Sequence, residues 1–325
     1  MEQFEHVACT VCGCVCDDLR ITVEEGRISK CEGACRPAEP WFLGQGSSRP
    51  SVALIDGQPA PLDAAVVQAA DILRATSSPL IYGLSRSSTD GQRAAIALGE
   101  RIGATIDRTA SLCHAPSVVA LQEVGEVTCT LGEVKNRADL VIFWGSNPVE
   151  SHPRHFERYS LLPKGQFIPG GRADRYTRFC ARRMRIPGDV TGADMVLAWQ
   201  TGYPFSVNLA RGYPRYNPGE FSAQEMLERE EVDACLLVGS EGVARFSEQA
   251  SAYLRRIPTI ALDYPTVESL IVPTIRFTTA VYGIHQPGTA YRMDGIPIPL
   301  RAFLPTDYPS DCEVLKLIAD QFTEN

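Results

Sequence analysis

The sequence contains no long hydrophobic run, and this absence excludes one large class of protein. A membrane-spanning helix needs about 18–20 consecutive apolar residues, and no stretch here approaches that length. The start, MEQFEHVACTVC, also lacks a basic segment followed by an apolar one, so we expect no signal peptide. We therefore predict a cytoplasmic protein without membrane insertion.

Basic charge is also in deficit. The formal net charge is −8 at pH 7, whereas a general nucleic-acid binder normally presents a basic face. We therefore expect no nucleic-acid partner. The sequence contains neither the G-x-G-x-x-G turn of dinucleotide-binding folds nor a Walker P-loop, and this disfavours a simple NAD- or ATP-dependent enzyme.

Cysteine, by contrast, is abundant and clustered near the N-terminus. The spacing Cys9-x2-Cys12-x3-Cys16, followed by Cys35, can surround one small inorganic centre, and LRITVEEGRIS between them predicts a β-hairpin that returns Cys35 to the others. The triplet is typical of [4Fe–4S] ligation. Structural zinc and cysteines without ligands are the alternatives, but zinc sites usually pair one C-x2-C with a second or with H-x3-H, and neither partner is present.

From Pro61 onward, amphipathic helices alternate with short apolar strands, which predicts an α/β fold with a mainly parallel sheet. In such sheets ligands bind at the carboxyl ends of strands, where glycine lets the backbone approach and helix N-termini accept phosphates. One such turn alone is a weak sign, because glycine also ends strands for steric reasons. Three in register predict a site for a large phosphorylated ligand: Gly83 and Ser85; Gly145, Ser146 and Asn147; Gly239 and Ser240.

The central stretch holds a thiol beside an imidazole, Cys113–His114. Three interpretations are open: a nucleophile with its base, a thiolate ligand of a soft metal with a neighbouring proton carrier, or two ordinary loop residues. Adjacent residues rarely face each other as a catalytic pair, so the residues alone favour the third interpretation and then the second. Farther on, His152 and His155 are most simply solvated histidines at a helix start.

Residues 176–220 lack helical or strand periodicity and are rich in glycine, proline and aromatics. A long loop of this kind indicates either a binding lid that carries Arg211 and Arg215, or a packed crossover whose arginines pair with carboxylates. The basic cluster RFCARRMR lies at the start of the same stretch.

Several stretches resemble the B subunit of formylmethanofuran dehydrogenase, in the molybdopterin oxidoreductase superfamily. They are CTVCGCVCDD, TASLCHAPSVVALQEVGEVTCTLGEVKNRADLVIFWGSNPVESHPRH and GYPRYNPGE, and the resemblance continues to GTAYRMDGIPIPLR. It implies an N-terminal iron–sulfur module followed by doubly wound, mainly parallel-sheet lobes. The boundaries we expect are 1–50 for the cluster module, 51–175 for the lobe with Cys113, 176–283 for the second lobe with the arginine-rich lid, and 284–325 for the tail.

The resemblance also implies a site. One [4Fe–4S] cluster would be bound by Cys9, Cys12, Cys16 and Cys35. Molybdenum or tungsten, held by a bis-pyranopterin guanine dinucleotide whose phosphates meet the strand-end turns, would take Cys113 as a ligand. His114 would lie at the active site, together with an arginine of the GYPRYNPGE region, Arg215 or Arg211.

The implied function is the interconversion of carbon dioxide and formate in one-carbon metabolism. An amidohydrolase-like A subunit would link formate to methanofuran, with C and D subunits in the same complex. Two departures support another hypothesis, a non-redox structural subunit of a formyltransferase/hydrolase complex. Arg175 runs directly into YTRFCARRMR where the family continues into a further α/β segment, and GYPFSVNLARGYPRYNPGE resembles the bacterial branch. A zinc-stabilised nucleotide-binding protein is a third hypothesis.

Overall fold

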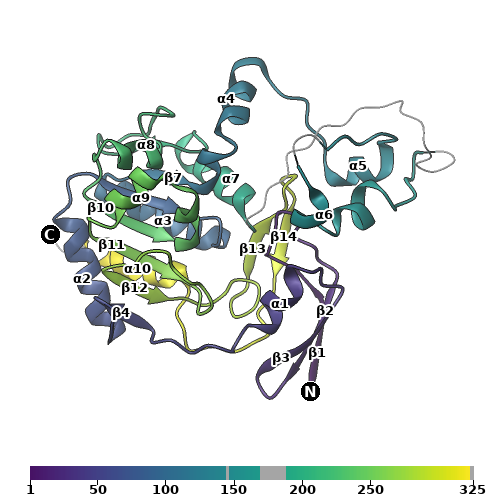
Figure 1. The fold of residues 1–325 in the computed structure, drawn as a ribbon, viewed down its shortest axis with the longest axis horizontal. Helices are drawn as coiled ribbons and strands as arrows, with labels where there is room; N and C mark the ends of the chain where they lie inside the picture. The colour runs from purple at the N-terminus through teal and green to yellow at the C-terminus, as the bar shows by residue number, and fades with distance from the viewer. Residues whose placement is uncertain (144–145, 169–187, 323–325) are drawn as a thin grey trace.

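The structure is a computed structural model of the 325-residue chain, and it describes residues 1–143, 146–168 and 188–322. Its centre is a nine-stranded mixed sheet in the order β5-β4-β12-β11-β10-β6-β7-β8-β9 (Figure 1). The five central strands are parallel: β12 (Ile275–Thr278), β11 (Thr259–Asp263), β10 (Ala234–Val238), β6 (Pro79–Gly83) and β7 (Thr105–Arg108). Antiparallel strands complete both edges: β4 (Ala53–Ile55), β5 (Gln58–Ala60), β8 (Val207–Asn208) and β9 (Arg215–Tyr216).

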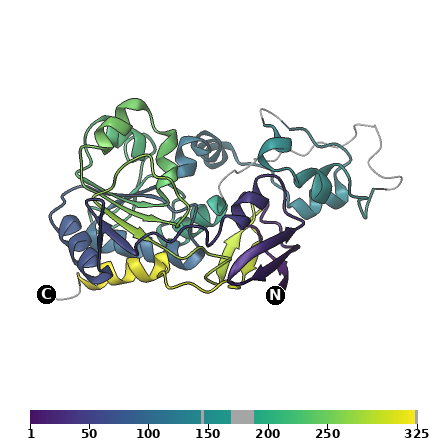
Figure 2. The same ribbon diagram turned by 60° about the horizontal axis from the view of Figure 1, so that its bottom comes forward.

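Helices cover both faces of this sheet, as Figure 2 shows. One face packs against α2 (Leu62–Arg74), α3 (Thr89–Ile102), α7 (Val190–Thr201) and α10 (Asp311–Asp320). The other packs against α8 (Ala223–Glu228) and α9 (Glu248–Leu254). Because the central strands are buried on both faces, they read as continuous apolar runs such as ACLLV in β10.

The chain order creates a switch point between β6 and β10. From β6 the chain passes through α3 to β7 on one side, and from β10 it passes through α9 to β11 on the other. A crevice forms where the connections diverge, at the carboxyl ends of the two strands, and ligands of open α/β sheets bind there.

The N-terminal module is a separate antiparallel sheet of β1 (Glu2–Val7), β2 (Leu19–Glu24) and β3 (Arg27–Glu32), followed by α1 (Ala38–Leu43). Its core includes side chains of the late hairpin β13 (Gly288–Tyr291) and β14 (Pro297–Leu300). The expected tail therefore divides its contacts: its hairpin packs on the cysteine module, and α10 packs on the central sheet. The domain boundaries themselves stay a prediction.

Between β7 and α7 the chain leaves the sheet as an arm, which we define as residues 115–143 and 146–168. It contains α4 (Ala115–Val124), α5 (Leu131–Arg137), α6 (Pro148–Ser151) and the π-helical turn η2 (Phe156–Ser160). Helix α4 buries only Val118 and projects from the body in Figure 1, whereas α5 and α6 lie beside the N-terminal module. The Leu131 N–H donates to Asp294 Oδ2 at 2.8 Å and helps to fix the arm there.

Three expectations differ from the structure. Residues 139–143, expected to form a strand, pair with none of the described strands; an apolar run becomes a strand only where a neighbouring strand satisfies its backbone. Strands from both expected lobes join one sheet. Inside the stretch expected to be irregular, α7 forms and β8 and β9 close the sheet edge; α7 is apolar on most sides, so it shows no amphipathic period.

No helix within residues 1–143, 146–168 and 188–322 is long and apolar enough to cross a membrane.

Candidate functional site

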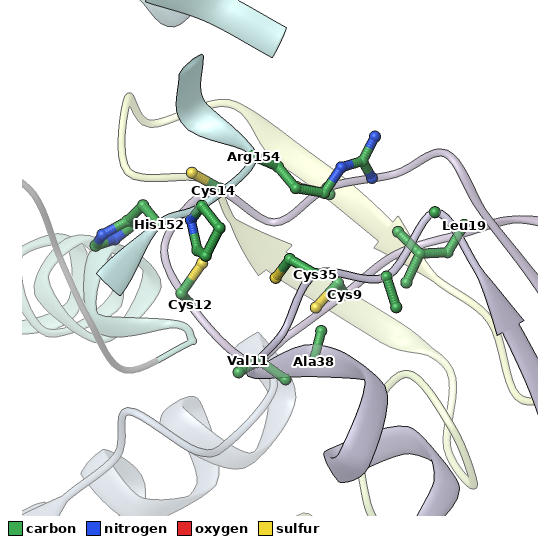
Figure 3. Close-up of a pocket in the computed structure, with 13 residues that line it drawn as sticks. Cys9, Val11, Cys12, Cys14, Leu19, Cys35, Ala38, His152 and Arg154 are labelled. Atoms are coloured by element: carbon green, nitrogen blue, oxygen red, sulfur yellow. The ribbon is translucent and has the colours of Figure 1, made fainter. Parts of the chain in front are cut away.

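The N-terminal cysteines converge on one pocket. Cys9, Cys12, Cys16 and Cys35 all line it, as the spacing predicts, and Cys14 lines it as well. Figure 3 shows Cys9, Cys12 and Cys35 around this pocket, which we call the cysteine pocket. Four of its thiols are therefore the four residues that the sequence analysis proposes as cluster ligands.

Local backbone structure brings these thiols together. The Cys9 N–H donates to the Cys16 carbonyl oxygen at 2.7 Å, which closes the loop between them, and Val15 adopts a positive φ of 36° within it. The β2–β3 hairpin then returns the chain to Cys35, whose carbonyl oxygen accepts the N–H groups of Ala38 and Glu39 at the start of α1. The predicted hairpin forms, and it has the predicted effect.

Burial in the cysteine pocket disfavours the charged thiolate form of the cysteines when no positive charge compensates it. It raises the pKa of Cys9 well above its ordinary value and that of Cys16 to about 12, although Arg158 opposes the shift at Cys16. The pKa of Cys12 is lowered, first by a hydrogen bond from Cys14. A cationic metal centre would lower these thiol pKa values, because metal ligation deprotonates thiols outright.

Among the described residues, no group of three or more His, Cys, Asp or Glu side chains is arranged to hold a metal ion. An iron–sulfur cube takes four thiolate ligands, and the lining of the pocket offers the four thiols that the spacing predicts. The donor set of four cysteines is also the usual one for [4Fe–4S].

The arm closes the cysteine pocket from outside the module. His152 and Arg154 line it beside Cys12 and Cys35 in Figure 3. The expectation of solvated histidines was wrong: His152 is 0% exposed and His155 is 1% exposed, because the arm packs against the module and covers them. The Nδ1 atoms contact Ser151 Oγ and Ser160 Oγ, respectively, so both imidazoles have polar partners in the interior.

A second cavity lies at the switch point, with a volume of about 200 Å³. Its lining comes from the turns after β6, β7 and β10: Ser85, Arg86, Thr109, Val238, Gly239, Glu241, Gly242 and Arg245. Gly83 ends β6 with a φ of 116°, and a Cβ there would lie 2.2 Å from the Val238 carbonyl oxygen. Two of the three predicted strand-end turns therefore meet at one crevice.

The third predicted turn does not join them. Ser146 precedes the short helix α6 and Asn147 is its N-terminal boundary, so both belong to the arm rather than to the sheet edge. Gly145 lies outside the described residues. The expectation of three turns in register was wrong, because residues 139–143 do not enter the sheet.

Ser240 and Arg86 show how the switch-point crevice is built. Ser240 donates its N–H and its Oγ–H to the two carboxylate oxygens of Asp263, each at 2.8 Å, which fixes the turn after β10. Arg86 Nε donates to Glu241 Oε1 at 2.9 Å, and Arg86 Nη1 donates to the carbonyl oxygen of Thr10 at 3.1 Å. Since Thr10 lies between Cys9 and Cys12, this arginine connects the crevice to the cysteine pocket.

Cys113 follows β7 through the turn η1 (Thr109–Leu112), and it is exposed. The base of this turn is tied to Asp107, a fully buried carboxylate. Asp107 accepts Ser111 Oγ–H at 2.7 Å, the Ala223 N–H at 2.7 Å and the Ser206 N–H at 3.1 Å. Burial raises the Asp107 pKa, and these donors oppose the shift. His114 follows at the start of α4, so the pair stands on a rigid base at the carboxyl edge of the sheet.

The two predicted arginines lie on the β8–β9 edge. Arg215 Nη2 donates to Asn208 Oδ1 at 2.7 Å, and its guanidinium lies 4.8 Å from the centre of the Phe221 ring. Arg211 is exposed. In the described part of the chain, no hydrogen bond or ion pair joins either arginine to Cys113. The backbone of this edge therefore matches the packed crossover that was one of the two alternatives for residues 176–220. The partner of Arg215 is the amide of Asn208, however, and not a carboxylate.

Comparison with known proteins shows which family the chain is related to. No model of a known protein family matches it. Its sequence is 32% identical over 427 aligned residues to the B subunit of the tungsten-containing formylmethanofuran dehydrogenase 2 of Methanocaldococcus jannaschii, with 98% of each chain covered. The protein of the same name from Methanococcus maripaludis is 30% identical over 432 residues, with 100% of each covered. The chain belongs to the B-subunit family of formylmethanofuran dehydrogenases.

The fold has a known counterpart as well. A chain in the crystal structure of the formyltransferase/hydrolase complex (FhcABCD) from Methylorubrum extorquens, solved with methylofuran, superposes with a TM-score of 0.69 at 20% identity. The match covers 84% of this chain and 99% of that one. The mixed α/β fold of this member of the formylmethanofuran dehydrogenase B-subunit family is thus shared with a chain of that complex.

This family member is shorter than its curated relatives. The alignment with the Methanocaldococcus protein runs over 427 positions whereas this chain has 325 residues, so more than a hundred positions have no counterpart here. The expected place of the gap, after Arg175, lies outside the described residues. The arm, whose residues 139–143 join none of the described strands, is the described part that precedes it.

Three residues that sequence reasoning did not single out shape the site. Asp107 carried a usable signal, since a carboxylate inside an apolar strand is rarely buried without partners. Arg86 follows the predicted turn after β6 directly. Arg154 belongs to the SHPRH sequence, but its contact with a loop 136 residues away in the chain follows only from the fold.

Proposed function

We propose that the chain is the redox subunit of a formylmethanofuran dehydrogenase-type complex and interconverts carbon dioxide and formate in one-carbon metabolism. The observation that carries the proposal is the cysteine pocket: its four thiols are in one place and are linked through Arg86 to the sheet edge from which Cys113 emerges. A redox subunit requires an electron-transfer centre that is connected to the edge of the sheet carrying the catalytic thiol.

In this proposal Cys9, Cys12, Cys16 and Cys35 hold a [4Fe–4S] cluster, which supplies one-electron transfer when bound. Cys113 is the protein ligand of molybdenum or tungsten. The curated relatives are named tungsten-containing, which supports this part of the proposal. Exposure suits Cys113 to the role, because a thiol that must meet a large cofactor cannot be enclosed by its own chain.

The turns with Gly83, Ser85, Gly239 and Ser240 are proposed to receive the phosphates of a bis-pyranopterin guanine dinucleotide. The crevice is lined by the hydroxyls of Ser85 and Thr109 and by the Arg245 cation, which are groups that bind phosphate, while its one carboxylate, Glu241, pairs with Arg86. Gly145, Ser146 and Asn147 are proposed to bind the second half of the cofactor. They would have to be brought to the sheet edge by a rearranged arm.

His114 is proposed to carry the proton, because it adjoins the thiol at the active edge. Arg211 and Arg215 are proposed to attract formate, an anion. Arg211 is exposed and can meet solvent directly, whereas Arg215 would have to release Asn208.

The complex itself is part of the proposal. The relatives are named as subunits, and the solved neighbour belongs to an assembly with the four-part name FhcABCD. We propose a cytoplasmic complex in which an amidohydrolase-like A subunit handles formyl-methanofuran, while C and D subunits complete the assembly.

A second candidate function rests on the missing positions. A non-redox structural subunit of a formyltransferase/hydrolase complex, handling formyl-methanofuran in formaldehyde oxidation, needs no complete pterin site. It agrees with the absence of more than a hundred positions and with the 99% coverage of the Methylorubrum chain. The retained thiols Cys113 and those of the cysteine pocket favour the redox subunit instead.

Formate oxidation by the purified complex separates the two functions. The redox subunit predicts reduction of a viologen dye by formate, and loss of that activity in Cys113→Ser with the iron content unchanged. Cys129→Ser, in the extended segment between α4 and α5, is the matched control. A wild-type complex that contains iron and still fails to oxidise formate supports the structural subunit.

A further inference from the structure

The cysteine pocket is flanked by positive charge that comes from the arm. Arg154 lines the pocket with a side chain only 12% exposed, and Figure 3 shows it on the arm side. Arg158, one helical turn later, is 17% exposed and pairs with Asp17 at 2.5 Å and with Asp18. Both arginines thus stand at a place where solvent screens charge poorly.

Arg154 is fixed by a fork on the cysteine loop. Its Nη1 and Nη2 donate to Asp18 Oδ1 at 2.6 Å and Oδ2 at 2.8 Å. Asp18 follows Cys16 by two residues, so the fork ties the arm to the loop that carries three of the four proposed cluster ligands. Arg154 also contacts Glu157 on the arm itself. Two opposite charges are therefore held at known positions beside the pocket.

The placement of these arginines sets their effect on a bound centre. Arg154 lines the cysteine pocket itself, and Arg158 pairs with Asp18 on the same loop. A positive charge held beside a poorly screened centre stabilises the negative charge that one-electron reduction adds to that centre.

We propose that Arg154, assisted by Arg158, sets the reduction potential of the centre bound in the cysteine pocket. The inference rests on the proposed [4Fe–4S] cluster. Each arginine makes the one-electron reduced cluster more favourable and thereby raises its potential, while Asp18 partly offsets them. Arg154 is a positioning residue in this account: it contacts the loop and acts on the cluster through its charge.

The alternative is a purely structural fork between arm and module, and opposite charge changes distinguish the two. Arg154→Gln and Asp18→Asn break the same ion pair, so a structural role predicts the same effect from both. A charge effect predicts opposite shifts: the potential becomes more negative in Arg154→Gln and more positive in Asp18→Asn. Arg154→Lys keeps the charge and should stay near the wild-type potential.

The experiment is a redox titration of the purified complex with dithionite, followed by the electron paramagnetic resonance signal of the reduced cluster. Iron per chain is measured first for every variant. Arg20→Gln is the matched control, since Arg20 lies on β2 of the same module and pairs with Glu5 and Glu32 away from the pocket. Should Asp18→Asn fail to fold, Arg158→Gln provides a second charge removal, with a shift to more negative potential expected.

Opposite shifts in the two variants, with Arg20→Gln unchanged, establish the inference. Shifts of the same sign in Arg154→Gln and Asp18→Asn, or an unchanged potential in iron-loaded Arg154→Gln or Arg158→Gln, overturn it and leave the cluster assignment intact. A wild-type complex without iron overturns the proposed cluster and this inference together, so the two failures are distinguishable.

Discussion

Arg86 Nη1 donates a hydrogen bond to the Thr10 carbonyl oxygen at 3.1 Å, and this contact joins two sites that are far apart in sequence. One end belongs to the crevice between β6 and β10, and the other to the loop between Cys9 and Cys12. Arg86 Nε also pairs with Glu241, so one guanidinium spans the sheet edge and the cysteine loop. Arg86 therefore holds the switch-point crevice next to the loop that carries the cysteine pocket.

Removing this connection should destabilise the protein. Arg86→Gln loses the ion pair to Glu241 and the hydrogen bonds to the cysteine loop, and we expect the free energy of unfolding to fall by ~1–3 kcal/mol. Arg93→Gln, on the exposed face of α3, should change it by less than ~0.5 kcal/mol. Urea unfolding of the two variants measures the difference, and equal stabilities would show that Arg86 has no anchoring role.

Gly83 should tolerate no side chain. With a φ of 116° and the Val238 carbonyl oxygen 2.2 Å from a built Cβ, Gly83→Ala must push β6 and β10 apart, and we expect a loss of roughly 3 kcal/mol or more. Gly57→Ala shares the positive φ, at 76°, but meets nothing within 4 Å. It should cost only about 1–2 kcal/mol. Thermal unfolding of both variants tests the close approach at the switch point.

The cysteine pocket makes a selective prediction about iron. Serine at position 9, 12, 16 or 35 should each lower the iron content of the complex, whereas Cys31→Ser should not, because Cys31 does not line the pocket. Cys14→Ser is the sharper case: Cys14 lines the pocket but is not a predicted ligand, so iron should be retained. Loss of iron in Cys14→Ser with retention in Cys12→Ser would reassign the ligand set.

Asp189 should make stability fall as pH rises from about 4 to about 8. It caps α7 and accepts the Gly192 N–H at 3.0 Å, the Tyr291 N–H at 2.6 Å and Gln92 Nε2 at 3.0 Å, yet burial raises its pKa to about 8. An unfolded aspartate titrates near ~3.9, so the folded state binds the extra proton between these values. The stabilisation it brings is complete at low pH and is lost as pH rises through about 8.

The useful window lies between pH ~6.5 and 8, because two other shifted groups titrate below it. Asp311 has a pKa raised by burial to about 6, and His285 has one lowered by burial to about 4. In this window the wild type should lose at most about 1.4 kcal/mol of stability per pH unit through Asp189. Asp189→Asn should remove that slope, and Asp71→Asn on the exposed side of α2 should retain it. Parallel slopes in the wild type and Asp189→Asn would contradict the assignment.

Much of the fold could be predicted from local pattern. The helices α2 and α3 have amphipathic periods, and the hairpin around Glu25–Gly26 has a turn signal, so each formed where it was expected. The mainly parallel sheet follows from the same alternation. Helix α7 could not be found in this way, because burial of Val190, Ala193, Val196 and Leu197 leaves no polar face to set a period.

Site residues could be predicted where nearby residues in the sequence determine them. They could not be predicted where contacts between distant segments bring them together. Spacing placed four cysteines in one pocket, and the glycine turns after β6 and β10 met at one crevice. The turn after residues 139–143 did not, since strand formation requires a partner strand that sequence pattern does not reveal. Arg154 and the buried His152 belong to the pocket only because the arm folds back onto the module.

Metal analysis of the purified wild-type complex tests the central claim most directly. Iron, molybdenum, tungsten and zinc are measured per chain, with pterin extraction alongside. The redox account predicts about four irons per chain, as one [4Fe–4S] cluster requires, together with molybdenum or tungsten and pterin. Zinc in place of iron, or iron without molybdenum, tungsten and pterin, would contradict it, and the second of these results would identify a structural subunit that retains only its cluster.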